Sequence, residues 1–176
     1  MIETQHGRDL GPRAGTIYGV TLLLGSRERF ALQIGGRAEG LRRVDAWVAG
    51  QWLTCDDNMA YVPQLRRCLQ RDRIRLESAE IPPSPFPGLS PPAVHRRLLA
   101  GDDGPRAQWC FLEWGPTTDN VLAHVFRESG YLVITVEFCR DEHLQRFPDH
   151  TGAVFTSEIT AEELAGILQN AAAALG

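Results

Sequence analysis

The feature that most constrains the fold is a pair of alternating segments, residues 121–128 and 131–139, joined by the two-residue turn Ser129-Gly130. Apolar and polar residues alternate along both segments, as in the strands of a hairpin with one buried face. A two-residue turn pairs residue 128 with residue 131, and this fixes the register of every other pair. We expect one face of the hairpin to be buried: Val121, Ala123, Val125, Leu132, Ile134, Val136 and Phe138.

The opposite face of this hairpin carries a candidate catalytic pair. In the predicted register His124 lies directly across from Thr135 and diagonal to Glu137, and diagonal neighbours are within reach of long side chains. A carboxylate beside a histidine can prepare the imidazole to act as a general base. The interpretation that we favour is a polar pair on the less buried face of the sheet.

Other segments also predict strands joined by short turns. The first predicted strand is at 16–24, and a turn at 25–28 and a return strand at 30–34 follow it. A second hairpin is predicted at 44–48 and 51–54 around Ala49-Gly50. Single strands are predicted at 109–114 and 153–157.

Helices are predicted in the middle and at the end of the chain. Pro63 suits a first helical turn, so we expect a helix at 63–71, and residues 73–77 fit a helix or a strand. A short helix is expected at 92–99. The last helix begins after Thr160, with Glu163 completing a capping box, and it has one apolar stripe: Leu164, Ile167, Leu168, Ala171 and Leu175.

These elements predict the α+β class, mainly antiparallel sheet built from hairpins, with a central helix and a C-terminal helix packed on it. The 176 residues fit one domain. We assign it to residues 16–176, after a flexible N-terminal arm at 1–15. The six prolines of 81–92 exclude a helix there, and we interpret this segment as a stiff crossover inside the domain or, alternatively, a linker between two domains.

Composition excludes several function classes. All 18 basic residues are arginine, so chemistry that needs a lysine amine, such as a Schiff base or a phosphate-loop lysine, is excluded. The net charge is −4, and residues 89–176 carry the acidic excess. The arginine-rich segment 64–78 has no aromatic residue, so we expect a solvated face and no nucleic-acid partner. No apolar run approaches the ~18 residues of a membrane span, and the first fifteen residues lack the apolar core of a signal peptide.

The potential metal ligands show no convincing spacing. The four cysteines, at 55, 68, 110 and 139, form no CxxC pair, and we expect free, buried thiols in a reducing cytoplasm. Cys139, Asp141, His143, Asp149 and His150 cluster in the sequence, but their spacing matches no closed tetrahedral site. Asp56-Asp57-Asn58 lacks the remainder of a calcium loop, so we expect it to cap a helix. We therefore predict no metal, no cofactor and no catalytic residue.

Several features resemble a known family. They are an N-terminal pair of strands, the Trp-Val-Ala-Gly-Gln-Trp hairpin at 47–52, a Val-Ile-Thr-Val-Glu-Phe strand after the turn at 129–130, and a Val154-Phe155 strand leading into the last helix from Thr160. This order resembles the immunity proteins of bacterial polymorphic-toxin systems, particularly the immunity protein 42 group. The resemblance implies a mostly β fold with a closing helix that neutralises a toxin domain in the cytoplasm.

We therefore expect a non-catalytic cytoplasmic binding protein, an immunity-like inhibitor of a protein partner. Acidic loop residues such as Asp102, Asp103 and Asp119 would favour capture of a basic partner, and an exposed tryptophan among Trp47, Trp52, Trp109 and Trp114 would be a candidate anchor. Two alternatives stay open. One is a small hydrolase or transferase that uses His124 and Glu137, and the other is a homo-oligomerising module that pairs through an exposed β edge.

Overall fold

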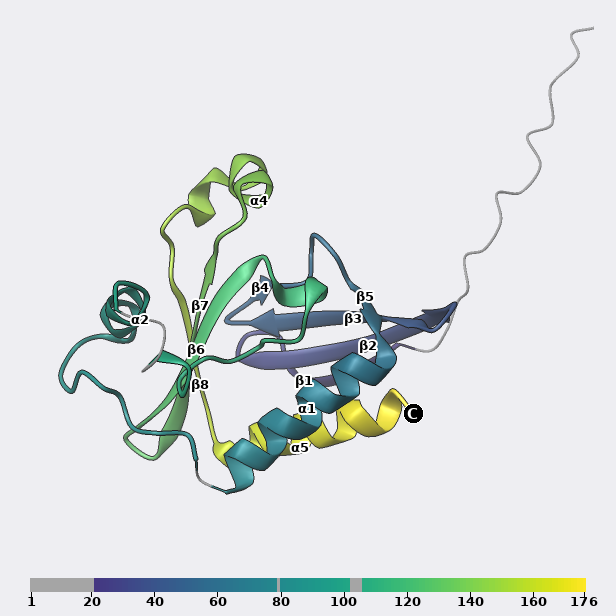
Figure 1. Ribbon diagram of the computed structural model, residues 1–176, viewed down its shortest axis with the longest axis horizontal. Helices are drawn as coiled ribbons and strands as arrows, with labels where there is room; N and C mark the ends of the chain where they lie inside the picture. Colours follow the sequence, from purple (N-terminus) through teal and green to yellow (C-terminus); the bar gives the residue numbers. More distant parts are fainter. Residues whose placement is uncertain (1–20, 79, 102–105) are drawn as a thin grey trace, which may run out of the picture.

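Two antiparallel sheets organise the chain in the computed structural model, which describes residues 21–78, 80–101 and 106–176 (Figure 1). The first sheet contains β1 (Leu22–Ser26), β2 (Phe30–Ala38), β3 (Leu41–Val48) and β4 (Gln51–Trp52) in that order, with β5 (Met59–Tyr61) also paired to β3. The second contains β6 (Val121–Glu128), β7 (Tyr131–Phe138) and β8 (Phe155–Ile159). The predicted α+β class with antiparallel pairing is confirmed. The predicted arm at 1–15 and the start of the first predicted strand lie outside the described residues.

The register of the β6–β7 hairpin is the predicted one. Glu128 pairs with Tyr131 across the turn, and His124 pairs with Thr135. All seven residues of the face predicted to be buried are buried. They join one continuous core that also draws residues from the first sheet and from the two long helices.

Those helices, α1 (Val62–Glu77) and α5 (Ala161–Ala174), lie side by side against the first sheet (Figure 1). Residues 73–77, which the sequence left open, continue α1. Asp72 interrupts the apolar stripe of α1 because it is a buried structural carboxylate that accepts a hydrogen bond from Trp114 Nε1 at 2.8 Å.

The capping box of α5 is half formed. Thr160 accepts a hydrogen bond from the Glu163 amide at 3.1 Å, as predicted. The Glu163 carboxylate pairs with Arg29 at 2.7 Å instead of reaching back to Thr160. The predicted apolar stripe of α5 is buried throughout.

The second face of the β6–β7 hairpin is the less buried of the two, as predicted, because Leu122 and Glu137 are only half-buried and Tyr131 is exposed. Its centre is nevertheless covered by another element. Helix α2 (Pro91–Leu99) packs Val94 and Leu98 onto Phe126 and Val133, which are 0% and 1% exposed. Helix α2 ends well before β6 begins, so the alternation along the strands could not show that α2 packs on this face.

The Pro-rich segment leads into α2 along the edge of the second sheet. Pro82 O accepts a hydrogen bond from the Arg127 amide at 2.9 Å, and the Ser84 amide donates to Arg127 O at 3.2 Å. Pro83 forms a parallel bridge with Arg127. The segment is thus tied to β6 by main-chain hydrogen bonds.

Several strand predictions need correction, among them the strand predicted at 51–54, which ends at Trp52 as β4. Residues 109–114 do not form a strand, because Leu112 has a φ of 60° and only Cys110 makes a bridge, to His124. The strand predicted at 153–157 begins two residues later, as β8. In the ranges that the structure describes, no helix has both the length and the apolar character to cross a membrane.

The predicted turn at Ala49-Gly50 joins β3 to β4, with φ values of 51° and 79° at its two residues. Positive φ at both positions is the conformation of the type I′ turn, which matches the twist of the flanking strands.

We expect Gly50→Ala to lower the free energy of unfolding by about 1 kcal/mol, because a residue with a Cβ is strained at this φ. An added methyl meets no atom within 4 Å, so backbone strain alone is measured. The matched control is Gly166 in α5, where the space is equally open and the backbone helical. Gly166→Ala should raise the free energy of unfolding by about 1 kcal/mol. Urea unfolding measures both, and changes of the same sign would contradict this account.

Candidate functional site

The structure places a third side chain between the predicted partners His124 and Glu137. His95 of α2 lies between the two, with its Nδ1 3.1 Å from His124 Nδ1 and its Nε2 3.4 Å from Glu137 Oε2. Thr135 Oγ1 lies 2.9 Å from His95 Nδ1. Sequence reasoning predicted the helix that contains His95 but not its packing on the hairpin, so His95 was missed.

Burial controls the charge of this histidine pair. His95 and His124 are 0% and 2% exposed. Burial, followed by the charge of Arg96, lowers the pKa of His95 to about 4. Burial, followed by the neighbouring His95 and by Arg106, lowers the pKa of His124 to about 3. Both rings are therefore neutral at pH 7, and such low pKa values make them weak proton acceptors.

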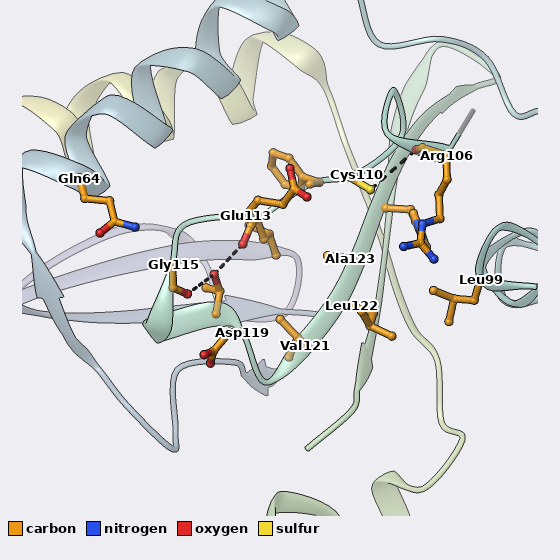
Figure 2. A pocket seen from close by; sticks show the side chains of 14 residues that line it. Gln64, Leu99, Arg106, Cys110, Glu113, Gly115, Asp119, Val121, Leu122 and Ala123 are labelled. Carbon is orange, nitrogen blue, oxygen red and sulfur yellow. Dashed lines mark hydrogen bonds between the residues drawn. The ribbon is translucent and has the colours of Figure 1, made fainter. Parts of the chain in front are cut away.

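A hollow of about 440 Å³ lies beside β6, and His124 contributes to its lining. Figure 2 shows Gln64 of α1 and Leu99 of α2 on opposite sides, with Cys110 contacting the Arg106 carbonyl oxygen at 3.7 Å. Glu113 also lines this hollow. Burial raises the pKa of the Cys110 thiol, so this thiol is not prepared to act as a nucleophile.

A second candidate site lies where α4 (Asp141–Arg146) and the short helix η2 (Pro148–His150) project between β7 and β8 (Figure 1). Five stacked or edge-packed rings hold this projection on the strand ends, and we call them the aromatic cluster: Phe138, His143, Phe147, His150 and Phe155. The closest pair is His143 on Phe138, with ring centroids 4.0 Å apart and planes 7° apart. Phe147 remains 36% exposed.

The projection and the loops beside it expose carboxylates. We call this end of the molecule the acidic tip, and its exposed acids are Asp56, Asp57, Asp119, Asp141, Glu142 and Asp149. Contacts connect them, because Asn120 Nδ2 donates to Asp56 at 2.8 Å and Arg140 pairs with the adjacent Asp119 at 2.5 Å. Of the acids predicted to meet a basic partner, Asp119 lies here, whereas Asp102 and Asp103 lie outside the described residues.

Part of the predicted histidine–cysteine cluster comes together at the base of the acidic tip. His143 Nε2 lies 2.9 Å from His150 Nδ1, and His143 Nδ1 lies 3.0 Å from Asp56 Oδ2 and 3.6 Å from Cys55 Sγ. Burial and the charge of Asp56 raise the pKa of Cys55 to about 11, and burial and the nearby His143 lower the pKa of His150.

The other members of that predicted cluster lie elsewhere. Cys139 is exposed, and its Sγ lies 3.9 Å from the Asp119 carbonyl oxygen. Asp141 and Asp149 are exposed outside the group formed by Cys55, Asp56 and His143. Cys55 and Asp56 were missed as partners of His143 because 87 positions separate Asp56 from that histidine.

Asp57 and Asn58 do not cap a helix. Asp57 Oδ1 accepts from the Met59 amide at 3.0 Å, and Asn58 Nδ2 donates to Asp45 at 2.8 Å. The helix that follows starts only at Val62, with Tyr61 at its N-cap position.

The exposure of the cysteines and tryptophans differs in part from what the sequence led us to expect. All four cysteines are free, as predicted, but none is fully buried. Trp114 is a core residue, and the other three are partly exposed, with Trp47 and Trp52 stacked at 5.8 Å.

The arginine-rich face of α1 is partly engaged within the protein. Arg71 pairs with Asp72 at 3.0 Å, and Arg75 donates to main-chain oxygens of Gln108 and Cys110. Two of the five arginines in segment 64–78, Arg71 and Arg75, therefore have a structural role.

The edge strand β1 is a third exposed feature. It pairs with β2 on one side, and Leu22 and Leu23 are 43% and 47% exposed. Among the described residues no strand pairs with its other side.

Comparisons of the chain with protein-family models, with curated proteins and with solved structures find no match.

Proposed function

We propose that the chain is a non-catalytic, cytoplasmic binding protein, an immunity-like inhibitor that sequesters a basic protein partner, such as a toxin domain, through its acidic tip. The observation that carries this proposal is a group of exposed acidic residues on and beside a projecting element that also carries the partly exposed Phe147. Interfaces commonly place an aromatic anchor among polar contacts, and Phe147 is such an anchor here.

The charge of the tip favours rapid capture of a cationic surface. Three arginines lie at or beside the tip, and all are engaged within the protein: Arg140 with Asp119, Arg146 over the Phe147 ring at 5.2 Å, and Arg96 with the Gly152 carbonyl at 3.1 Å. The remaining negative potential raises the rate of encounter with a basic partner and opposes binding to a polyanion such as nucleic acid.

The aromatic cluster gives the tip a fixed shape. Rings from α4, η2, β7 and β8 pack on one another, so α4 is held at its base and not only by its two connections. A pre-organised surface loses less conformational entropy on binding, which increases affinity.

The enzymatic alternative has one observation in its favour, the hollow that His124 lines. Against it stands the pKa of about 3 for that histidine, which makes it a weak base. If the hollow is an active site, His124→Gln will abolish the hydrolase or transferase activity of the isolated protein. A cooperative unfolding curve will show that the variant is still folded.

The inhibitor proposal predicts that a toxin-like domain is encoded beside this gene, and that domain, once identified, is the binding partner for the test. Removing three tip charges with D57N/E142Q/D149N should slow association with that domain about tenfold at low salt, because steering depends on the summed charge. The difference should shrink at high salt, where charges are screened. Stopped-flow or surface-binding kinetics give the rates.

The matched control removes three exposed acids outside the tip with E80Q/E158Q/E162Q. Its association rate should stay within about twofold of the unchanged protein. Equal slowing by the two triple variants, or no binding of the neighbouring domain at all, would overturn the proposal.

A further inference from the structure

Three side chains of metal-binding type meet at the base of the acidic tip. Cys55 and Asp56 come from the loop between β4 and β5, and His143 comes from α4. Their potential ligand atoms, the Cys55 Sγ, a carboxylate oxygen of Asp56 and a ring nitrogen of His143, all lie within 4.8 Å of one another.

Two of the three ligand separations are close to those of a tetrahedral zinc site. Zinc bonds of about 2.3 Å to sulfur and about 2.05 Å to nitrogen imply a ligand separation of about 3.6 Å. The observed distance from Cys55 Sγ to His143 Nδ1 is 3.6 Å. The distance from His143 Nδ1 to Asp56 Oδ2 is 3.0 Å, and it needs to open by only about 0.3 Å to reach the tetrahedral value.

The ligand types select the metal. Thiolate and imidazole suit zinc, whereas magnesium and calcium take oxygen ligands almost exclusively. Asp56 also retains 20% exposure of its side chain, which gives an ion a route to the site.

Neighbouring groups orient two of the ligands. His150 Nδ1 lies 2.9 Å from His143 Nε2, the nitrogen that does not face Cys55 and Asp56. Asn120, which is 2% exposed, donates from Nδ2 to Asp56 Oδ2 at 2.8 Å and to Leu53 O at 2.9 Å. Metal-binding histidines and carboxylates usually have such hydrogen-bonded supports.

We propose that Cys55 Sγ, Asp56 Oδ2 and His143 Nδ1 bind one Zn²⁺ ion, with water in the fourth position. Binding releases the proton of the thiol to solvent, and His143 binds as the tautomer that carries its ring proton on Nε2, facing His150 Nδ1. The ion joins the β4–β5 loop to α4, so it also fixes the acidic tip on the first sheet. This inference is independent of the identity of the partner protein.

The test uses the full-length chain, purified with reductant and chelator and then dialysed, with Zn²⁺ as the probe. Calorimetry should show one ion per chain with a dissociation constant of about 1 μM or lower. Saturating zinc should also raise the unfolding temperature by about 5 °C. Cobalt in place of zinc should give the ultraviolet charge-transfer band of a thiolate-bound ion.

Two ligand variants and two matched controls make the test specific. Cys55→Ala and Asp56→Asn should each weaken zinc binding by at least about tenfold, and Cys55→Ala should abolish the cobalt band. Cys139→Ala and Asp57→Asn change an exposed thiol and the adjacent acid outside the group, so binding should stay within about twofold. No stoichiometric zinc, or equal binding by the protein with Cys55→Ala, overturns the proposal. All four changes lie at exposed or half-buried positions, so each variant should fold.

Discussion

Lowering the pH from 8 to 5 should reduce the free energy of unfolding by roughly 4 kcal/mol through His95 and His124 alone. Their folded pKa values are about 4 and about 3, below the value of 6.5 for an unperturbed histidine. The unfolded chain therefore binds protons as the pH falls through about 6.5, whereas the folded chain does not bind them until pH 4 or below. The stabilisation is complete above pH 7 and decreases steadily between pH 6.5 and pH 3.

The charged groups around the pair do not reverse this direction. Glu137 lies 3.4 Å from His95 and favours its protonation, but Arg96 and Arg106 oppose the charged rings, and burial is the largest cause for both. Urea unfolding at pH 8, 7, 6 and 5 measures the slope. The variant H95Q/H124Q should show a flatter slope over this range. If the two proteins lose stability in parallel, the pair is not the cause.

Asp72→Ala should destabilise the protein by about 3 kcal/mol. The Asp72 side chain is 1% exposed, and it accepts from the Trp114 indole at 2.8 Å and pairs with Arg71 at 3.0 Å. Its removal leaves the indole N–H of Trp114 buried without a partner. It also removes the negative charge that pairs with Arg71. Urea unfolding at pH 7 measures the loss.

A double-mutant cycle separates this hydrogen bond from general packing. The combination of Asp72→Ala with Trp114→Phe should cost less than the sum of the single changes, by about 1 to 2 kcal/mol. The exposed pair Arg73 and Glu77 on the same helix is the control, because Glu77→Ala should change stability by at most about 0.5 kcal/mol. Additive effects of the two core changes would contradict a direct bond.

The sequence determined local features well because short-range geometry decides them. The two-residue turn at 129–130 set the β6–β7 register, and alternation along the strands identified its buried face. The turn at Ala49-Gly50 and the stripe of α5 followed from the same kind of reasoning. Each depends on residues close together in the chain.

The candidate sites depend on residues that are far apart, and spacing carried no signal for them. His95 reaches His124 and Glu137 only because α2 covers the hairpin. Cys55 and Asp56 reach His143 only because the β4–β5 loop lies at the base of α4. Asp72 is a charged residue within an apolar stripe, and this pattern indicates a buried partner. The sequence did not show that the partner is Trp114.

The most direct test of the central claim, that the acidic tip captures a basic partner, is hydrogen exchange on the complex with the toxin-like domain that the proposal predicts beside this gene. Binding through the tip predicts new amide protection in residues 55–58 and 139–151, with little change elsewhere. Protection centred on β1, or on the strand β6 beside the hollow, would contradict the claim, because it would place the interface at the sheet edge or at the His124 site.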